Sequence, residues 1–409
     1  MFSFLDIIVF LLITFYSNPL SLEFIPNEIL FPILFLISLR YITVLKIDKY
    51  IALFFIVILF SIIFHFLNFR ISFLRDIGIL LTMLTSFLLI SSKGYKFLIS
   101  FVKIVYFLIL ISIPFWLSFN FFILLFGLDV VTEFLRDFSF EYSGNKSDLN
   151  LKQNDRFNFL VFFNYTNNPS LYFRNHGYMW EPGQFAAYIS YSLIFMDILK
   201  SKFSIKIPKY YYYVHYLGLL SSFSTAGYII MFFHVVISNL SRSIKNVGSF
   251  FSNNFFFIIL FTSGSIIFAI NTDFIATKIL TQYTNDITSY NFYAGRLNIA
   301  FMIQQIIQNP LFGSGTFLIS TTDIFATQTF SSINGYLVFA RSWGIIAFIL
   351  MNLITYYSML YCFNEHRVAL LYFILFILIA MSQNLFLSFL AYILMFFYNY
   401  SYTSKELNN

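Results

Sequence analysis

The chain is a succession of long apolar runs separated by short polar segments. Twelve runs approach the length of about 20 residues that a helix needs to cross a bilayer. They cover residues 4–20, 26–44, 50–68, 73–91, 97–127, 183–199, 210–223, 225–240, 254–271, 335–361, 368–382 and 385–400. Because the runs are continuous rather than alternating, they favour helices over the strands of a membrane barrel. The pattern predicts an all-α polytopic integral membrane protein with about 12 transmembrane helices.

Two of these predictions carry local detail. The run 97–127 is too long for one straight crossing, so we expect Pro114 to kink it and its end to lie in the membrane interface. The runs 368–382 and 385–400 are short and are separated by Ser382, Gln383 and Asn384, so one tilted helix is an alternative to two.

Runs and polar segments divide the chain into five parts. These are N-terminal transmembrane helices (1–128), a first external loop (129–182), central transmembrane helices (183–270), a second external loop with an amphipathic helix (271–334), and C-terminal transmembrane helices with a short cytoplasmic tail (335–409). Loops longer than about 15 residues in a compact protein usually carry function or are disordered.

Composition supports the membrane class. Hydrophobic residues make up 59% of the 409 residues and charged residues only 10%, whereas soluble domains are about a quarter charged. The single cysteine, Cys362, excludes an intrachain disulfide. The net charge of +6 is distributed along the segments between spans and does not indicate binding to nucleic acid.

The charge distribution predicts the orientation. With the N-terminus inside, the inner segments hold 14 of the 24 basic residues but only 5 of the 18 acidic ones. Cytoplasmic segments of membrane proteins are enriched in Lys and Arg. We therefore expect both termini to be cytoplasmic and both long loops to be external.

The first external loop ends in a concentration of polar chemistry, FRNHGYMWEPGQFAAY (Phe173 to Tyr188). Proline is favoured in the first turn of a helix, and an acid at a helix N-terminus is stabilised by the macrodipole. A helix cap is therefore one interpretation of Glu181, but a cap leaves the preceding arginine and histidine unexplained. The residues of this stretch that are candidates for chemistry or for the turn are Arg174, His176, Gly177, Glu181, Pro182 and Gly183.

The second external loop holds AGRLNIAFMIQQIIQNPLFGSGT, residues 294–316. Its apolar positions recur with helical spacing and predict an interfacial helix that Asn309 and Pro310 end. Gly313 and Gly315 follow in a turn. Arg296 stands near the helix start, where its charge opposes the dipole, so a ligand anion would explain it; a snorkelling arginine is the alternative.

A third stretch, SSINGYLVFARSWGII, leads from residue 331 into the next span. Asn334 and Tyr336 lie at the entry, and Gly344 lies a few turns inside. Asn334 is either a helix cap or a ligand-binding residue.

In this order, the three stretches resemble the O-antigen polymerase and ligase superfamily, of the Wzy and WaaL type. The likeness covers residues 170–350 and includes Ser221 to Ile230, which is similar to the family's Ser-Arg-Thr-Gly turn with Thr225-Ala226 in place of Arg-Thr. Ligases and some polymerases carry a histidine beside the asparagine of the third stretch. Here that neighbour is Ile333, which favours a polymerase.

The resemblance implies a metal-independent glycosyltransferase without cofactors, in the bacterial inner membrane with its active site on the external face. It would transfer glycan from a polyprenyl-diphosphate carrier to the sugar hydroxyl of another lipid-linked repeat unit, for O-antigen, capsule or exopolysaccharide. The expected partners are the lipid-linked oligosaccharide, membrane lipids, and a chain-length regulator and flippase of the same pathway. Nucleic acid is not expected.

That reaction assigns roles to the polar residues. Arginine grips phosphate with paired charged hydrogen bonds, which makes Arg174 and Arg296 candidates for binding the diphosphate. Glu181 is the first candidate for the base that takes the acceptor proton, and His176 is the second. The remaining candidates, for glycan binding or backbone turns, are Gly177, Gly183, Gly313, Gly315, Asn334 and Tyr336.

Two alternatives remain open. One is the ligase, which moves finished glycan onto lipid A–core. The other is a flippase or another transporter, which should place ionisable groups at mid-membrane. The mid-span candidates, each expected near a helix end or packed, are His65, Lys103, His215 and His234.

Overall fold

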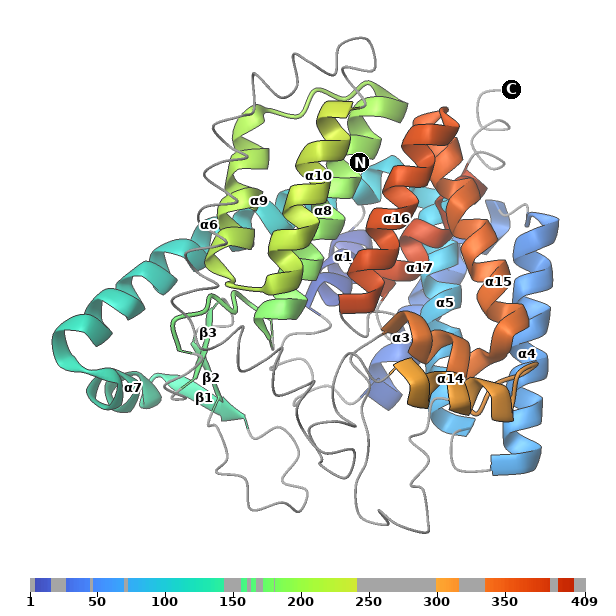
Figure 1. Cartoon of the computed structure of the whole chain (residues 1–409), viewed down its shortest axis with the longest axis horizontal. Coiled ribbons are helices and arrows are strands. Elements are labelled where there is room, and N and C mark those ends of the chain that lie inside the picture. Colours follow the sequence, from blue (N-terminus) through green and yellow to red (C-terminus); the bar gives the residue numbers. More distant parts are fainter. Residues whose placement is uncertain are drawn as a thin grey trace.

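A computed structural model describes residues 4–15, 27–44, 47–69, 73–142, 156–159, 163–166, 172–179, 181–240, 299–315, 335–382 and 389–400, and the structural statements below concern these. The fold is a bundle of helices with a small sheet at one end (Figure 1). Its helices are α1 (Phe4–Phe15), α3 (Asn27–Ser38), η1 (Leu39–Val44), α4 (Lys49–Phe69), α5 (Phe73–Lys93), α6 (Tyr95–Phe126), α7 (Leu128–Arg136), α8 (Pro182–Phe203), α9 (Lys209–Ser221), α10 (Thr225–Leu240), α14 (Ile299–Gln308), α15 (Gly335–Phe363), α16 (His366–Ser382), α17 (Phe389–Phe396) and η3 (Phe397–Asn399).

Four of the described helices, α4, α5, α6 and α15, are long and apolar enough to cross a membrane. The other predicted spans that fall on described residues are helical but shorter or more polar, and the run 254–271 lies outside the described residues. A mostly helical chain, with four described helices that are long and apolar enough to cross a membrane, is therefore confirmed, and the number of 12 crossings stays a prediction.

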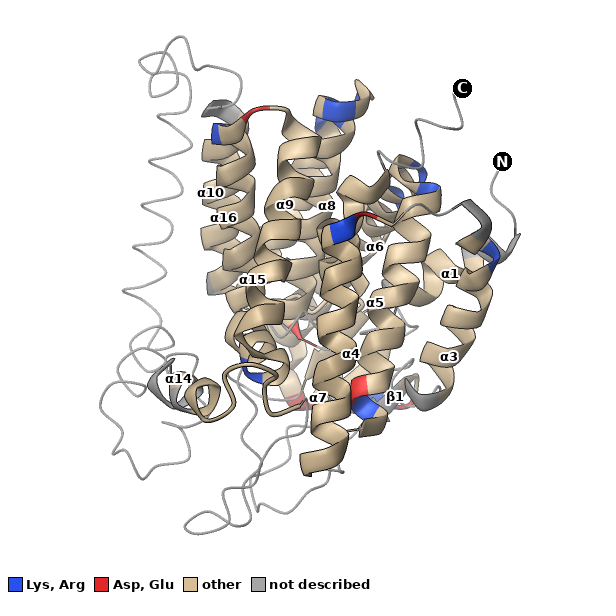
Figure 2. Ribbon diagram, turned by 90° about the vertical axis from the view of Figure 1, so that its right-hand side faces the viewer, with Lys and Arg blue, Asp and Glu red and all other residues tan. Residues whose placement is uncertain are grey.

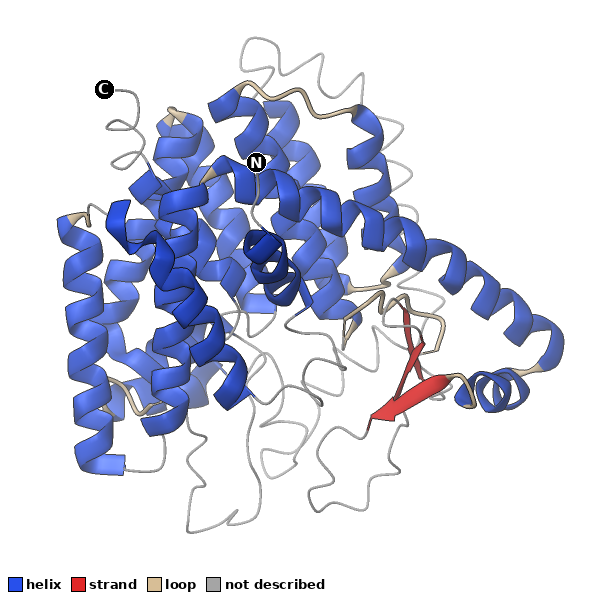
Figure 3. Cartoon of the chain, turned by 180° about the vertical axis from the view of Figure 1, so that it is seen from behind, coloured by secondary structure: helices blue, strands red, loops and turns tan. Residues whose placement is uncertain are grey.

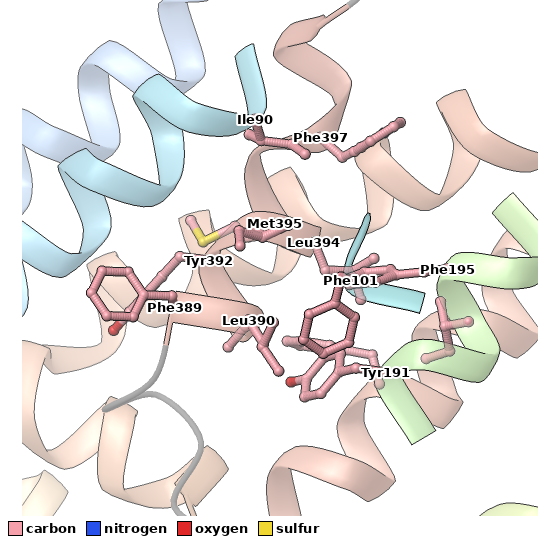
Figure 4. Close-up of a cluster of buried hydrophobic side chains, with 14 of the residues drawn as sticks. Ile90, Phe101, Tyr191, Phe195, Phe389, Leu390, Tyr392, Leu394, Met395 and Phe397 are labelled. Atoms are coloured by element: carbon pink, nitrogen blue, oxygen red, sulfur yellow. The ribbon is translucent and has the colours of Figure 1, made fainter. Parts of the chain in front are cut away.

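The last predicted span stays a prediction, because residues 383–388 lie outside the described residues. Its described part begins with α17, which has 8 residues. All of its side chains are buried, and Figure 4 shows them in the interior of the bundle, beside side chains of α5, α6 and α8. The labelled neighbours are Ile90, Phe101, Tyr191 and Phe195. α17 is an interior helix that other helices surround.

α6 stays one continuous helix of 32 residues through Pro114, so the proline does not divide it. At about 48 Å it is longer than the hydrocarbon core is thick. Its C-terminal half leaves the bundle, with α7 at its far end and the sheet between α7 and the bundle (Figure 3). This half exposes large apolar side chains, including Leu124 at 83% and Phe126 at 59%.

The all-α expectation is wrong for the segment 129–182, whose described part contains a three-stranded antiparallel sheet. The strands are β1 (Ser139–Tyr142), β2 (Arg156–Phe159) and β3 (Phe163–Thr166), paired in the order β1-β2-β3. Aromatic and polar residues alternate in β2 and β3, which is the two-residue period of a strand. One face therefore packs on α6, where Phe163 and Tyr165 contact Phe119 at ring distances of 5.7 and 5.1 Å.

Tyr165 closes this sheet against β1. Burial raises the pKa of Tyr165 to about 12, outweighing the opposing effects of its hydrogen bond to Ser139 and of the Arg136 charge. The phenol therefore stays protonated at neutral pH and donates to the Ser139 hydroxyl at 3.0 Å.

The two ends of the bundle differ in charge. Lys and Arg gather at the end where α8 leads into α9, and Asp and Glu lie mainly at the opposite end (Figure 2). At the basic end lie Lys200, Lys202, Lys206, Lys209 and Arg367. The N-terminus of α8, the sheet and α14 all lie at the opposite end (Figure 1). The ends of both long loops that the structure describes are thus at one end of the bundle.

A buried carboxylate ties four helices together. Asp197 of α8 accepts hydrogen bonds from Tyr212 of α9 at 2.9 Å, Tyr372 of α16 at 2.5 Å and Nε2 of His234 of α10 at 2.7 Å. The other ring nitrogen of His234 accepts from the Tyr216 hydroxyl at 3.0 Å. The mid-span His234 is therefore packed into a closed network, as expected.

Two of the other three mid-span candidates, His65 and His215, are packed as expected, whereas Lys103 is not. His65 forms a buried pair with Asp76, its Nδ1 lying 2.7 Å from the carboxylate. His215 accepts from the Ser192 hydroxyl at 2.7 Å and donates to a backbone carbonyl of its own helix. Lys103 is exposed on α6.

We predict that Asp197→Asn lowers the stability of the bundle by about 1–3 kcal/mol, because the amide places an NH2 donor where the carboxylate accepts and so leaves a buried donor unsatisfied. The measurement is the melting temperature of detergent-purified protein. Asp129→Asn, at an exposed site on α7, is the control and should change stability by less than about 0.5 kcal/mol. Equal melting of wild type and Asp197→Asn would contradict this role.

Candidate functional site

The N-terminus of α8 presents Glu181 in a defined conformation. Glu181 is the N-cap residue with φ −136° and ψ 149°, and Pro182 occupies the first helical turn. Its backbone carbonyl accepts from Phe185 N at 3.0 Å, but its side chain makes no capping hydrogen bond. The carboxylate, which is half-buried, is therefore not used as the cap. Gly183, also in this first turn, is buried.

The preceding segment is held by Asn175, which the sequence analysis did not single out. Its Oδ1 accepts from Gly177 N at 2.8 Å, and its Nδ2 donates to the Ser221 hydroxyl at 2.9 Å. Its backbone N–H donates to the Ser221 carbonyl at 2.9 Å. Asn side chains that bond the backbone two residues on form a recognised turn, so the Asn-His-Gly sequence was the available signal.

Gly177 has to be glycine at this turn. Its φ is +55°, and a Cβ there would lie 2.5 Å from the ring of Phe185. The segment therefore sits close on the first turn of α8, because no side chain intervenes.

The α9–α10 connection completes this part of the site. Arg174 Nε donates to the carbonyl of Ser222 at 3.4 Å, and Phe173 packs edge-on against Phe223 at 5.3 Å. Phe223 itself has a positive φ of 46°. The structure thus joins the Arg174 stretch to Ser221–Ile230, two stretches that the sequence analysis linked only through the resemblance.

The sheet holds the same segment from its other side. Asn164 of β3 donates from its backbone to Gly177 O at 2.8 Å and from Nδ2 to Met179 O at 2.8 Å. Asn158 of β2 donates to Asn164 Oδ1 at 2.7 Å. Between these contacts, His176 is only 3% exposed.

The turn after α14 binds the broken helix α15. Gly344 interrupts α15 with φ 81° and ψ 172°. Ser314 N donates to Arg341 O at 2.9 Å, Gly315 N to Ser342 O at 3.1 Å, and Ile345 N to Pro310 O at 2.7 Å. The expected amphipathic helix and its glycine turn are therefore present. The turn forms backbone hydrogen bonds with the N–H and C=O groups that the break in α15 leaves without partners in the helix.

Both partners in this contact need glycine. A Cβ on Gly313 would lie 2.4 Å from Ser342 O, and a Cβ on Gly344 would lie 2.1 Å from Leu311 O. Both residues, like Gly315, have φ between 75° and 81°. These glycines thus allow the backbone turns and their close contact. For Gly313 and Gly315 this is one of the two predicted roles, the other being glycan binding.

Tyr336 lies in the short N-terminal part of α15. Its ring centroid is 4.7 Å from that of Phe348, and its hydroxyl donates to Asn352 Oδ1 at 2.6 Å. In a straight helix, residues 12 apart would be about 18 Å apart along the axis. The helix therefore folds back sharply at Gly344. The hydrogen bond of the Tyr336 hydroxyl holds the two parts of α15 together.

Arg341 is a site residue that the sequence analysis passed over. It is 6% exposed, and its Nη1 lies 3.5 Å from Gln305 Oε1 of α14. The signal in the sequence was a charge inside an apolar run, three residues before a glycine. Arg296 and Asn334 lie outside the described residues, so their predicted roles stay predictions.

The candidate residues form two groups. Arg174, His176, Gly177, Glu181 and Gly183 lie together around the start of α8, and Gly313 and Gly315 lie against α15. Both groups are at the same end of the bundle (Figure 1). In the part of the chain that the structure describes, no group of three His, Cys, Asp or Glu residues is placed to hold a metal ion.

We predict that Gly344→Ala costs clearly more stability than Gly127→Ala. Both residues have strongly positive φ, but a Cβ on Gly127 would meet nothing within 4 Å. Gly127→Ala therefore reports the cost of the backbone conformation alone, about 1–3 kcal/mol. The excess at Gly344 measures the contact with the α14 turn, and equal melting temperatures would show that this contact contributes nothing.

Searches of protein-family models, of curated proteins and of solved structures find no match to this chain.

Proposed function

We propose that this protein is a polysaccharide repeat-unit polymerase of the bacterial inner membrane. It would transfer glycan from a polyprenyl-diphosphate carrier to a sugar hydroxyl of another lipid-linked repeat unit. The observation that carries the proposal is the group around the start of α8, where Arg174 and Glu181 are held on one short segment by Asn175, Asn164 and the α9–α10 turn.

The location suits a substrate that is half lipid and half sugar. Such a substrate needs its carrier in the bilayer and its sugar in water, so its reactive bond lies at the membrane boundary. The start of α8 and the α14 turn lie at one end of a bundle that contains membrane-length helices. This arrangement supports a site between lipid and water.

The geometry favours Glu181 over His176 as the base. A base must come within about 3 Å of the hydroxyl whose proton it takes. His176 is buried beneath the sheet and α8, whereas the Glu181 carboxylate is half-exposed and is not used as a cap. A helix N-terminus also stabilises the carboxylate form. The His176 imidazole would then support the loop.

The charge that develops on the leaving diphosphate needs a cation. Arg174 is half-buried beside the α9–α10 turn, and a guanidinium there can bind phosphate oxygens with charged hydrogen bonds. Arg296 would approach from the second loop. Stabilising developing charge in this way is often the largest single contribution to catalysis.

We predict that Glu181→Gln melts like wild type but elongates chains at least about a hundredfold more slowly, because the amide cannot accept the proton. The assay is purified protein with lipid-linked repeat units, read as a product ladder on a gel. Glu365→Gln is a matched control, since the Glu365 carbonyl accepts from Ala369 N at 2.9 Å at the start of α16, as Glu181 does for α8.

Glu365 lies at the opposite end of the bundle, so its replacement should leave the ladder unchanged. If Glu181→Gln builds ladders at the wild-type rate, Glu181 is not the base. If wild-type protein builds no ladder from authentic lipid-linked units, the polymerase proposal itself is wrong.

We also predict that the end of the bundle bearing α14 faces the cell exterior. In a Cys362→Ser background, Gln308→Cys at the exposed end of α14 should react with an impermeant maleimide on intact cells. Lys206→Cys, at the exposed basic end, should react only after permeabilisation. The reverse labelling pattern would overturn the orientation.

A further inference from the structure

Arg341 carries a charge that the described protein does not neutralise. Its side chain is 6% exposed, and its buried Nε has no hydrogen-bond partner. Its one side-chain hydrogen bond to a described residue, from Nη1 to Gln305 Oε1 at 3.5 Å, is long and has a neutral acceptor. Among the described residues no Asp or Glu forms an ion pair with it. The Ser342 hydroxyl beside it is also buried without a partner.

A second cation adds to the positive charge. Arg75 is exposed near the start of α5, at the end of the bundle where the α14 turn binds α15. The acid next to it, Asp76, is already paired with His65 at 2.7 Å. His65 Nε2 in turn donates to Phe312 O of the α14 turn at 2.8 Å. The nearest carboxylate in the sequence is therefore engaged by a histidine.

The break in α15 indicates where Arg341 and Arg75 lie relative to the membrane. Residues 345–363 alone make a helix of about 28 Å, which is close to the thickness of the hydrocarbon core. The part that contains Arg341 folds back at Gly344, so it lies at the end of the spanning segment. Arg75, two residues after the start of α5, lies at the corresponding end of its own helix. Both arginines are thus at one membrane boundary.

A buried arginine without a counter-ion is unfavourable in the protein alone. Apolar residues of similar volume fill such positions equally well or better. Two like charges that approach each other increase this cost. An anion bound between the two guanidinium groups would remove it, and phosphate matches their geometry, because guanidinium groups bind phosphate oxygens through paired hydrogen bonds.

We propose that Arg341 and Arg75 form a binding site for a phosphate group at the membrane boundary, with the Ser342 hydroxyl and the Gln305 amide beside it. The site is separate from the Arg174 group and does not depend on the proposed polymerase activity. The phosphate comes either from a lipid headgroup or from a free phosphate compound, and the two sources share this recognition chemistry.

The test measures melting of the full-length protein with two probes. Inorganic diphosphate is titrated into protein in an uncharged detergent, and nanodiscs of phosphatidylcholine are compared with nanodiscs that also contain phosphatidic acid. We expect a saturable rise in melting temperature with at least one probe. A rise with diphosphate alone assigns a free phosphate compound, and a rise with phosphatidic acid assigns a lipid headgroup.

Variants identify the site. Arg341→Met should weaken the apparent affinity for the stabilising probe at least about tenfold, since it removes charged hydrogen bonds. Arg75→Gln should weaken the affinity for that probe less. Without any probe, Arg341→Met should melt at or above the wild-type temperature, because an unpaired buried charge is gone. Arg367→Gln, an exposed arginine at the basic end, is the matched control and should leave both values unchanged.

Three results would overturn the site. The first is no stabilisation by either probe, and the second is unchanged affinity in Arg341→Met. The third is melting of Arg341→Met well below wild type without probe, which would make Arg341 a packing residue. Arg174→Gln should retain the Arg341-dependent stabilisation, which separates this site from the Arg174 group. Because no step measures chain elongation, failure of the polymerase proposal leaves this result interpretable.

Discussion

The break of α15 at Gly344 imposes the constraint on which this end of the molecule depends. A break inside a membrane-length helix frees backbone N–H and C=O groups, and each must find a partner where water is scarce. The turn after α14 supplies these partners through three backbone hydrogen bonds, and His65 and Ser61 add side-chain donors to Phe312 O and Trp343 O. Helix α14, the start of α15 and the ends of α4 and α5 are thereby assembled around one backbone irregularity.

The start of α8 is built differently, from amide side chains rather than from a break. Asn158, Asn164 and Asn175 form successive hydrogen bonds that connect the sheet, the segment before α8 and the α9–α10 turn. A buried polar network of this kind fixes geometry, because each member must stay in place to satisfy the next. The consequence for function is a rigid loop end that holds Arg174 and presents Glu181 without using its carboxylate as a helix cap.

Much of the site could be predicted from local sequence. Glu181-Pro182-Gly183 starts a helix because proline fits a first turn, and the Gly-x-Gly turn follows α14 because Asn309 and Pro310 end it. Asn175 and Arg341 were missed for one reason. Their importance lies in partners more than 30 residues away, such as Ser221 and Gln305, and no local pattern records such contacts. The sheet was missed because an alternation of four residues is short against the surrounding apolar runs.

The sequence by itself determined which of the described segments are helical, since apolar runs of sufficient length in a membrane leave the backbone no other way to satisfy its hydrogen bonds. It also determined that polar chemistry gathers at the ends of two loops. Only the tertiary structure decided that α17 lies inside the bundle, that Asp197 joins four helices, and that Arg341 is buried with no acid paired to it among the described residues. Burial and pairing depend on which helices become neighbours, and lipid-facing and protein-facing surfaces of such helices are equally apolar. Hydrophobicity therefore identifies the helices, whereas the contacts between their few polar groups define their arrangement.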